Sequence, residues 1–356
     1  MQLGIVGLPK VGKTLLFNIL TTAREETGKF SASQKTHVGV ARVEDPRLEA
    51  LRDLFEPRRY APAAVEYVDL PGLHLGDGGQ GPDLGVLRPV DALVHVVRCF
   101  EDPEIVHSTG RLDPSRDILD LDLELVLADH ELVEKRLSRL AQAEKRGLKD
   151  EEKRERALLA ETLLPALESE TPLRDLELAA ADERRLRGFQ LLSAKPQLLV
   201  LNVGEDDLAS PPPDDVMAAA RRETEIIVVS APIEEEISRL DAADQQELLG
   251  DLGLVEPSLQ RLIRASYSLL GLVSFFTVGE DEVKAWTIGR ETRAQDAAGK
   301  IHTDIARGFI RAEVVQWRDL IDLGAWSECQ KNAKLQLEGK DYLVQDGEVV
   351  HFRFNV

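Results

Sequence analysis

The chain contains little cysteine, no long apolar run and no excess of positive charge, and each absence excludes a class of protein. Only Cys99 and Cys329 occur among 356 residues, so we expect neither a disulfide framework nor a thiolate metal cluster. No apolar run approaches the ~18 residues of a membrane span. Met1 leads almost directly into an apolar strand-like run, which leaves no room for a signal peptide. We therefore expect a cytoplasmic protein that has no membrane partner.

Acidic residues outnumber basic ones, with 64 Asp+Glu against 44 Lys+Arg and a formal net charge of −20. This balance argues against a protein that coats nucleic acid through its overall field, and we expect no DNA partner. A local basic face could still contact RNA. Hydrophobic residues make up 43% and charged residues 30% of the chain, which is typical of a globular protein, and its length predicts two or three domains.

The chain does contain a G-x-x-x-x-G-K-[ST] motif from Gly7 to Thr14, between an apolar run and a helix-like segment. This strand–loop–helix context is typical of a phosphate-binding loop, in which glycines let backbone N–H groups point at phosphate oxygens. Lys13 would neutralise the β- and γ-phosphates, and the Thr14 hydroxyl would ligate Mg²⁺. The residues expected to contact nucleotide here are Lys10, Val11, Gly12, Lys13, Thr14 and Leu15.

A second nucleotide signal is the D-x-x-G sequence from Asp69 to Gly72, directly after a short predicted strand. Asp69 at the carboxyl end of the strand can hold Mg²⁺ through water, and Gly72 can offer its N–H to a γ-phosphate. The polar stretch around Ser33–Thr36 and the glycine-rich stretch Asp69–Gly81 are the candidate switch segments.

The loops that follow two further predicted strands are expected to bind the base of the nucleotide. The run 197–201 is followed by Asn202, Val203 and Glu205, and the run 225–229 by Ser230, Ala231 and Pro232. In a doubly wound sheet the ligand lies at the carboxyl ends of the strands, so these loops and the phosphate loop can converge on one nucleotide.

The remaining patterns predict the domain organisation. Residues 119–194 repeat leucine at helical spacing with charges between, which predicts an inserted helical or coiled-coil arm with a turn at 147–150. Basic residues near that turn could contact RNA, although a solvated arm is the simpler interpretation. Short strand patterns follow at 272–278, 282–288, 314–317, 342–344 and 349–354. We expect a P-loop NTPase domain at 1–118 and 195–270, the arm at 119–194, and an α+β domain at 271–356.

These residues resemble the YchF family of Obg-related P-loop NTPases, also called Obg-like ATPases, over essentially the whole chain. Gly7 to Asn18 is similar to the family's G-L-P-N-V-G-K-S-T-L-F-N, and His95 to Phe100 with His107 is similar to its H-V-V-R-C-F…H stretch. The C-terminal stretches that match are 285–288, 299–304, 307–313 and 338–342. The resemblance implies a C-terminal TGS domain of ubiquitin-like β-grasp fold, ATP hydrolysis, and association with the ribosome or its large subunit. RNA contact through the arm and the TGS domain would accompany that association.

The choice of base can be weighed from the residues. A GTPase uses N-K-x-D, whose carboxylate accepts two hydrogen bonds from guanine, but here Val203 replaces the lysine and Glu205 the aspartate. We therefore expect ATP with Mg²⁺, and GTP is the alternative. Ser33 falls where the family pattern has the Mg²⁺-sensing threonine, and Thr36 is the second candidate.

Turnover is expected to be slow because Leu73 occupies the position at which Ras-like enzymes carry a water-orienting glutamine. The resemblance points to His107 as a substitute, the alternatives being a loop histidine without a catalytic role and His74. The sequence thus predicts a nucleotide-dependent switch with slow ATP hydrolysis. The alternatives are a slow GTPase and a ribosome- or RNA-binding switch with negligible turnover.

Overall fold

The structure of the chain is a computed structural model that describes residues 1–22, 37–70, 84–103, 107, 110–145, 147–221 and 224–355. The chain divides into two compact units. The first comprises Met1–Gly39 and Glu66–Arg261, and the second comprises Val40–Val65 and Leu262–Val356. The expected site residues Ser33 and Gly72 lie outside the described residues, as do Thr36, Leu73 and His74.

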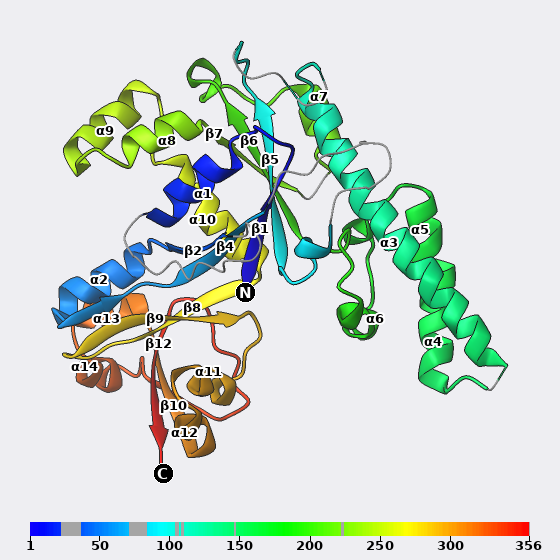
Figure 1. Cartoon of the computed structure of the whole chain (residues 1–356). Coiled ribbons are helices and arrows are strands. Elements are labelled where there is room, and N and C mark those ends of the chain that lie inside the picture. Colours follow the sequence, from blue (N-terminus) through cyan, green and yellow to red (C-terminus); the bar gives the residue numbers. More distant parts are fainter. Residues whose placement is uncertain are drawn as a thin grey trace. The chain divides into compact units, whose positions relative to one another are not determined.

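A six-stranded sheet in the order β2-β4-β1-β5-β6-β7 forms the centre of the first unit (Figure 1). The strands are β1 (Gln2–Val6), β2 (His37–Arg42), β4 (Ala64–Asp69), β5 (Ala92–Cys99), β6 (Gln197–Val203) and β7 (Glu225–Val229). The pairs β1·β4, β1·β5, β5·β6 and β6·β7 are parallel. Every residue of β6 is buried, as expected for a parallel strand covered on both faces. The predicted doubly wound α/β fold is confirmed.

The helices that follow the strands of the first unit are α1 (Lys13–Thr22), α7 (Asp214–Ala219), α8 (Ala231–Ile237) and α9 (Ala242–Asp251). Helix α10 (Ser258–Leu269) begins in the first unit and belongs to the second unit from Leu262 onward. Two apolar clusters pack on the sheet, one around Leu199 and Leu201 and the other around Val6 and Leu93. Helix α1 follows β1 after a short loop, and α8 begins just after β7, so both N-termini lie at the carboxyl edge of the sheet, where an anion is favoured.

The segment between β5 and β6 forms a helical arm that belongs to the first unit. It contains α3 (Pro114–Glu144), α4 (Asp150–Leu158), α5 (Leu164–Glu168) and α6 (Ala180–Leu186). In Figure 1, α4 and α5 run back along the long helix α3, and their leucines share one apolar cluster with it. Asp113 caps α3 by accepting the Arg116 N–H at 3.2 Å, and Pro114 occupies the first helical position. The predicted inserted helical arm, with its turn before Asp150, is therefore present.

The second unit contains a six-stranded sheet in the order β11-β10-β12-β8-β9-β3. Its strands are β3 (Arg59–Ala61), β8 (Leu272–Thr277), β9 (Glu282–Gly289), β10 (Phe309–Gln316), β11 (Gln336–Glu338) and β12 (Glu348–Phe354). Its helices are α2 (Pro46–Phe55), α11 (Ala294–Ile301), α12 (Thr303–Arg307), α13 (Trp317–Leu323) and α14 (Trp326–Lys331). The β-grasp (TGS) assignment of residues 271–356 stays a prediction, as do the three predicted domain boundaries.

Two expectations about this unit are wrong. The strand expected at 342–344 is only an isolated bridge between Leu343 and Arg293. The strand expected to begin at Val314 begins at Phe309, where two adjacent apolar residues are followed by the charged Arg311 and Glu313 and give no clear alternation. The segment Val40–Val65 also belongs to the second unit. The sequence had instead predicted it as part of the P-loop NTPase domain at 1–118.

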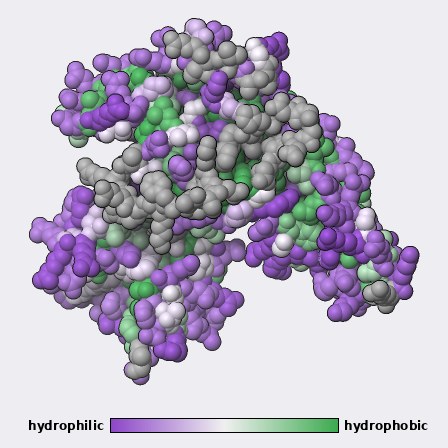
Figure 2. Space-filling model, viewed as in Figure 1, coloured by the Kyte–Doolittle hydropathy of each residue, from purple (hydrophilic) through white to green (hydrophobic). Residues whose placement is uncertain are grey.

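Hydrophilic side chains cover most of the face of the molecule visible in Figure 2, in keeping with the net charge of −20. Among the described residues, no helix combines the length and the apolar composition that crossing a membrane requires.

Candidate nucleotide-binding site

The loop between β1 and α1 adopts a conformation that requires glycine at two positions. Gly7 has φ +146°, and a Cβ there would lie 2.3 Å from the Val96 carbonyl oxygen. Gly12 has φ +98°, and a Cβ there would lie 2.4 Å from Asn202 Nδ2. Neither the backbone angles nor the space accepts a side chain, so the loop packs directly on β5 and on the end of β6.

Lys13 is the buried cation of this loop. Its side chain is 6% exposed, and Nζ donates to the carbonyl oxygens of Gly7 at 3.0 Å and Leu8 at 2.7 Å. Burial lowers the pKa of Lys13 to about 8, and the charge of Asp69 opposes that shift. An ammonium has three donors, so the group held here can also donate to a phosphate oxygen.

Thr14 and Asp69 lie side by side, where β1 and β4 pair and both end. Thr14 Oγ1 donates to Asp69 Oδ2 at 3.1 Å. Asp69 Oδ1 is buried and accepts no hydrogen bond from any described residue. Burial raises the pKa of Asp69, and the bond from Thr14 and the charge of Lys13 oppose this. A hydroxyl and a buried carboxylate with an unused oxygen are hard oxygen donors, so the pair fits Mg²⁺, which keeps several waters and needs few protein ligands.

Asn202 connects the phosphate loop to the loop after β7. Its Nδ2 donates to the Val11 carbonyl oxygen at 2.9 Å, and its Oδ1 accepts the Ala231 N–H at 3.1 Å. The side chain is 4% exposed, so both bonds are shielded from water. The structure therefore brings together three of the predicted loops, those after β1, β6 and β7, at one edge of the sheet.

The other residues expected at the base differ in exposure. Val203 is 8% exposed and packs in the apolar cluster with Leu201 and Leu208, so its side chain faces the core. Glu205 is exposed in the turn after β6. Ser230 and Ala231 are buried at the start of α8, and Pro232 is exposed.

Lys10 and Leu15 complete the predicted loop residues. Lys10 is exposed and has φ +64°, a left-handed conformation that is uncommon for lysine but frequent for asparagine. This backbone angle accounts for the asparagine at that position in the family pattern. Leu15 lies in the first turn of α1 and is half-buried.

His107 lies against the first turn of the arm helix. Its Nε2 is 2.9 Å from Asp117 Oδ2, and the side chains are 6% and 2% exposed. The sequence did not predict this contact, because Asp117 stands in a long helical pattern of polar and apolar residues.

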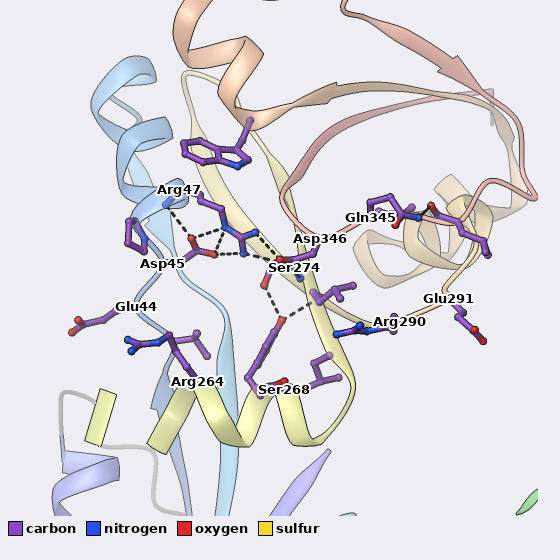
Figure 3. A pocket seen from close by; sticks show the side chains of 18 of the residues that line it. Glu44, Asp45, Arg47, Arg264, Ser268, Ser274, Arg290, Glu291, Gln345 and Asp346 are labelled. Atoms are coloured by element: carbon purple, nitrogen blue, oxygen red, sulfur yellow. Dashed lines mark hydrogen bonds and ion pairs between the residues drawn. The ribbon is translucent and has the colours of Figure 1, made fainter. Parts of the chain in front are cut away.

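The second unit contains a separate cavity of about 780 Å³ (Figure 3). Arg47 at its wall pairs with Asp45 at 2.8 Å and Asp346 at 2.6 Å, and Asp346 also accepts the Ser274 N–H at 2.9 Å. These bonds join the start of α2 to β8 and to the turn before β12. Asp346 thus helps to hold the segment Val40–Val65 within this unit.

A glycine-rich loop between a parallel strand and a helix, a buried lysine and a Thr–Asp pair at the same sheet edge together define a P-loop nucleotide-binding protein. Comparisons with known proteins agree. A family model described as "50S ribosome-binding GTPase" matches residues 2–129, and the YchF-GTPase C-terminal model, described as a protein of unknown function, matches residues 272–355.

Relatives align over the full length of the chain. "Ribosome-binding ATPase YchF" of Bacillus subtilis is 43% identical over 363 residues, with 99% of both chains covered. The protein of the same name from Escherichia coli O157:H7 is 42% identical over 361 residues, again with 99% of both covered. The solved structure of the Schizosaccharomyces pombe YchF GTPase has a TM-score of 0.88 at 29% identity and covers 99% of this chain and 97% of that one. The chain belongs to the YchF family.

Proposed function

We propose that this chain is a Mg²⁺-dependent nucleotide hydrolase of low intrinsic rate that prefers ATP to GTP and associates with the ribosome. The observation that carries the proposal is the group of Lys13, Thr14 and Asp69 at the carboxyl edge of the parallel sheet. There a buried cation lies beside two oxygen ligands, one of which has an unused buried oxygen.

In this proposal the phosphates bind to the loop from Lys10 to Leu15, and Gly72 senses the γ-phosphate. Asn202 keeps the base-side loops aligned with the phosphate loop through its bonds to Val11 and Ala231. The base itself is read by Asn202, Val203, Glu205, Ser230, Ala231 and Pro232. Thr14 and Asp69 would hold Mg²⁺ together with Ser33. Bound Mg²⁺ would neutralise charge on the β- and γ-phosphate oxygens.

The preference for ATP rests on the turn after Asn202. The guanine-reading carboxylate of N-K-x-D is absent, because Glu205 carries its carboxylate one methylene further out and is exposed. Val203 is packed in the core and leaves no lysine stem to cover the base. The printed names of the Bacillus subtilis and Escherichia coli relatives, both ATPases, support the same preference.

Slow turnover follows from Leu73, whose apolar side chain cannot orient water. We propose that His107 takes the role of catalytic group. A switch that binds nucleotide with negligible turnover is the second candidate, and Leu73 is the observation that favours it.

The ribosome is the proposed partner because relatives at 42–43% identity carry "Ribosome-binding" in their names. The arm tip contributes less to RNA binding than its lysines and arginines suggest. Lys153 pairs with Asp150 at 3.0 Å, Arg154 with Glu151 at 3.5 Å and Arg156 with Glu144 at 2.6 Å. These pairs reduce the local positive field, so shape and the C-terminal domain should matter more than the tip charge. We propose the cytoplasm as the location.

The base preference is tested by titrating ATP and GTP against purified full-length protein in the presence of Mg²⁺. ATP should bind more tightly, and Glu205→Asp, alone and with Val203→Lys, should shift the preference toward GTP. Asp206→Asn, which alters an exposed carboxylate in the same turn, is the matched control and should change neither affinity. Tighter GTP than ATP binding by the parent protein would overturn the preference.

Turnover is tested separately by single-turnover phosphate release with and without ribosomes. Hydrolysis that is slow alone and faster with ribosomes supports the proposal. No release above the protein-free rate in either condition would favour the binding switch.

A further inference from the structure

The cavity of the second unit has the size and the lining of a ligand site. Its volume of about 780 Å³ lies within the range of about 300–1,000 Å³ that is usual for ligand pockets. Four of the side chains that line it are apolar and buried, namely Val43, Leu272, Val273 and Val344. Leu343 also lines the cavity and is 42% exposed although it is apolar. Such a lining favours a ligand with a sizeable apolar part.

The polar groups along one wall of the cavity already have partners within the protein (Figure 3). Arg47 is bound by both Asp45 and Asp346. The Tyr267 hydroxyl lies 2.8 Å from Ser274 Oγ. A polar group with partners inside the protein has a structural role, so these residues form the wall and require no ligand.

Two arginines that line the same cavity differ from Arg47. Arg290 follows β9 directly, and Arg318 lies in α13. The Arg290 backbone is fixed, because its N–H donates to the Gly271 carbonyl oxygen at 2.8 Å. Neither of the two guanidinium groups makes a hydrogen bond or an ion pair with any residue in the described ranges. Their N–H donors are therefore available to a ligand.

The carboxylates around the cavity do not neutralise these two cations. Asp45 and Asp346 are already bound within the wall. Glu291 follows Arg290 in the sequence, but its side chain points away from that of Arg290, and Glu44 lies far from Arg290 in the same view (Figure 3). Most of the chain's excess of negative charge also lies in the other unit. The two guanidinium groups thus suit an anion, and their planar shape fits phosphate through two parallel hydrogen bonds.

An aromatic ring lies beside one of these cations. Trp317 lines the cavity and is half-buried, and the Arg318 guanidinium lies over its indole, 5.4 Å from the ring centroid. Gly347, with φ +84°, lets the turn before β12 approach the ring, because a Cβ there would lie 3.1 Å from Trp317 Cδ1. The indole is therefore held in place. Nucleobases of every kind stack on such rings.

We propose that this cavity binds a nucleotide unit, with its base against Trp317 and the apolar lining and its phosphate on Arg290 and Arg318. A nucleotide combines a flat base with an anion, whereas a carboxylate on an aliphatic chain would use the guanidinium groups but not the ring. Two sources supply such a unit, a free mononucleotide and a single-stranded RNA segment, and the test separates them. The cavity lies in a different unit from the phosphate loop, so this inference does not rest on the hydrolysis proposed above.

The test is a titration of the full-length protein with AMP, UMP and single-stranded RNA hexamers of adenylate and of uridylate. Affinity is measured by equilibrium dialysis, in the parent and in Lys13→Met, whose phosphate loop lacks its cation. Binding should persist in Lys13→Met. Arg290→Gln and Arg318→Gln should each weaken it about fivefold or more. For the hexamers each should also reduce the slope of log affinity against log salt by about 0.7, the value for one phosphate contact on a single strand.

Tryptophan fluorescence gives a second readout. Trp317→Phe keeps a ring, so affinity should stay within about threefold, but most of the quenching by a stacked base should disappear, because Trp286 and Trp326 do not line the cavity. Arg293→Gln is the matched control. Arg293 pairs with Asp341 at 2.9 Å and does not line the cavity, so its replacement should change neither the affinity nor the salt slope.

The outcomes separate the two sources and the two proposals. Hexamers that bind tenfold or more tightly than the mononucleotides identify single-stranded RNA as the ligand, and a smaller difference identifies a free nucleotide. If none of the four ligands binds Lys13→Met, or if Arg293→Gln weakens binding as much as Arg290→Gln, the proposal is overturned. Phosphate release from Mg·ATP, measured on the same Arg290→Gln protein, should match the parent, so failure here leaves the function proposed above intact.

Discussion

Two buried lysines at opposite edges of the same parallel sheet have nearly the same protein surroundings. At the carboxyl edge, Lys13 donates to the carbonyl oxygens of Gly7 and Leu8. At the amino edge, Lys195, just before β6, donates to those of Arg88 at 3.0 Å and Val90 at 2.5 Å. They are 6% and 9% exposed, and burial lowers the pKa of each. Neither burial nor pKa therefore distinguishes a binding residue from a structural one.

The difference lies in the carboxylates near each edge. Asp129, near the amino edge, accepts the Leu192 N–H at 2.9 Å and both the N–H and the hydroxyl of Ser193 at 2.7 Å, so both its oxygens are used. Asp69, at the carboxyl edge, has one buried oxygen that no described residue uses. Burial raises the pKa of both carboxyl groups. A complete set of partners indicates a structural role, and an incomplete one indicates a place for a ligand.

The largest expected effect concerns the amino edge. Asp129→Ala would leave the Leu192 and Ser193 amides without their acceptor inside the protein, which should lower the free energy of unfolding by about 3 kcal/mol or more. Denaturant unfolding at neutral pH measures this. Glu131→Ala, an exposed residue on the same helix, should change it by less than about 0.5 kcal/mol. If both variants lowered the free energy of unfolding by a similarly small amount, a full set of hydrogen-bond partners would not identify a carboxylate with a structural role.

The next largest effect is expected when each of the two buried lysines, Lys13 and Lys195, is replaced by methionine. Lys13→Met should weaken Mg·ATP binding about 100-fold or more, some 3 kcal/mol, because the charge facing the phosphates is lost. Lys195→Met should leave Mg·ATP affinity nearly unchanged. Both variants should destabilise the nucleotide-free protein by about 1–3 kcal/mol, because two buried carbonyl oxygens lose their donor in each. Isothermal titration and thermal unfolding of both variants measure the contrast. If Lys13→Met and Lys195→Met lost Mg·ATP affinity equally, the two edges of the sheet would not differ in nucleotide binding.

The sequence was most informative where a local pattern determines the structure. The phosphate loop, the Asp69 strand end and the strands β5 to β7 could be placed because glycine spacing and apolar runs are local signals. The gathering of Gly12, Val11, Asn202 and Ala231 followed from a general rule about the carboxyl edge of parallel sheets, but the individual hydrogen bonds did not.

Contacts between distant parts of the chain could not be predicted. No periodicity indicates that Arg47 pairs with Asp346, so the membership of Val40–Val65 in the second unit was missed. The pairing of His107 with Asp117 depends on how a loop returns to a helix. Val203 was predicted from its position after a strand, yet its side chain packs in the core, because alternate residues of that strand end face opposite sides.

The smallest expected effect separates backbone strain from ligand binding at Lys10. Lys10 in the phosphate loop and Glu170 in the arm are both exposed and both left-handed, with φ +64° and +56°. Asparagine tolerates this conformation better than either, so Lys10→Asn and Glu170→Asn should each raise the free energy of unfolding by less than about 1 kcal/mol. Mg·ATP affinity, measured by titration, should stay within about threefold for both. A tenfold loss of affinity in Lys10→Asn alone would make its ammonium a phosphate ligand, and the loop would then hold two functional cations where its buried geometry accounts for one.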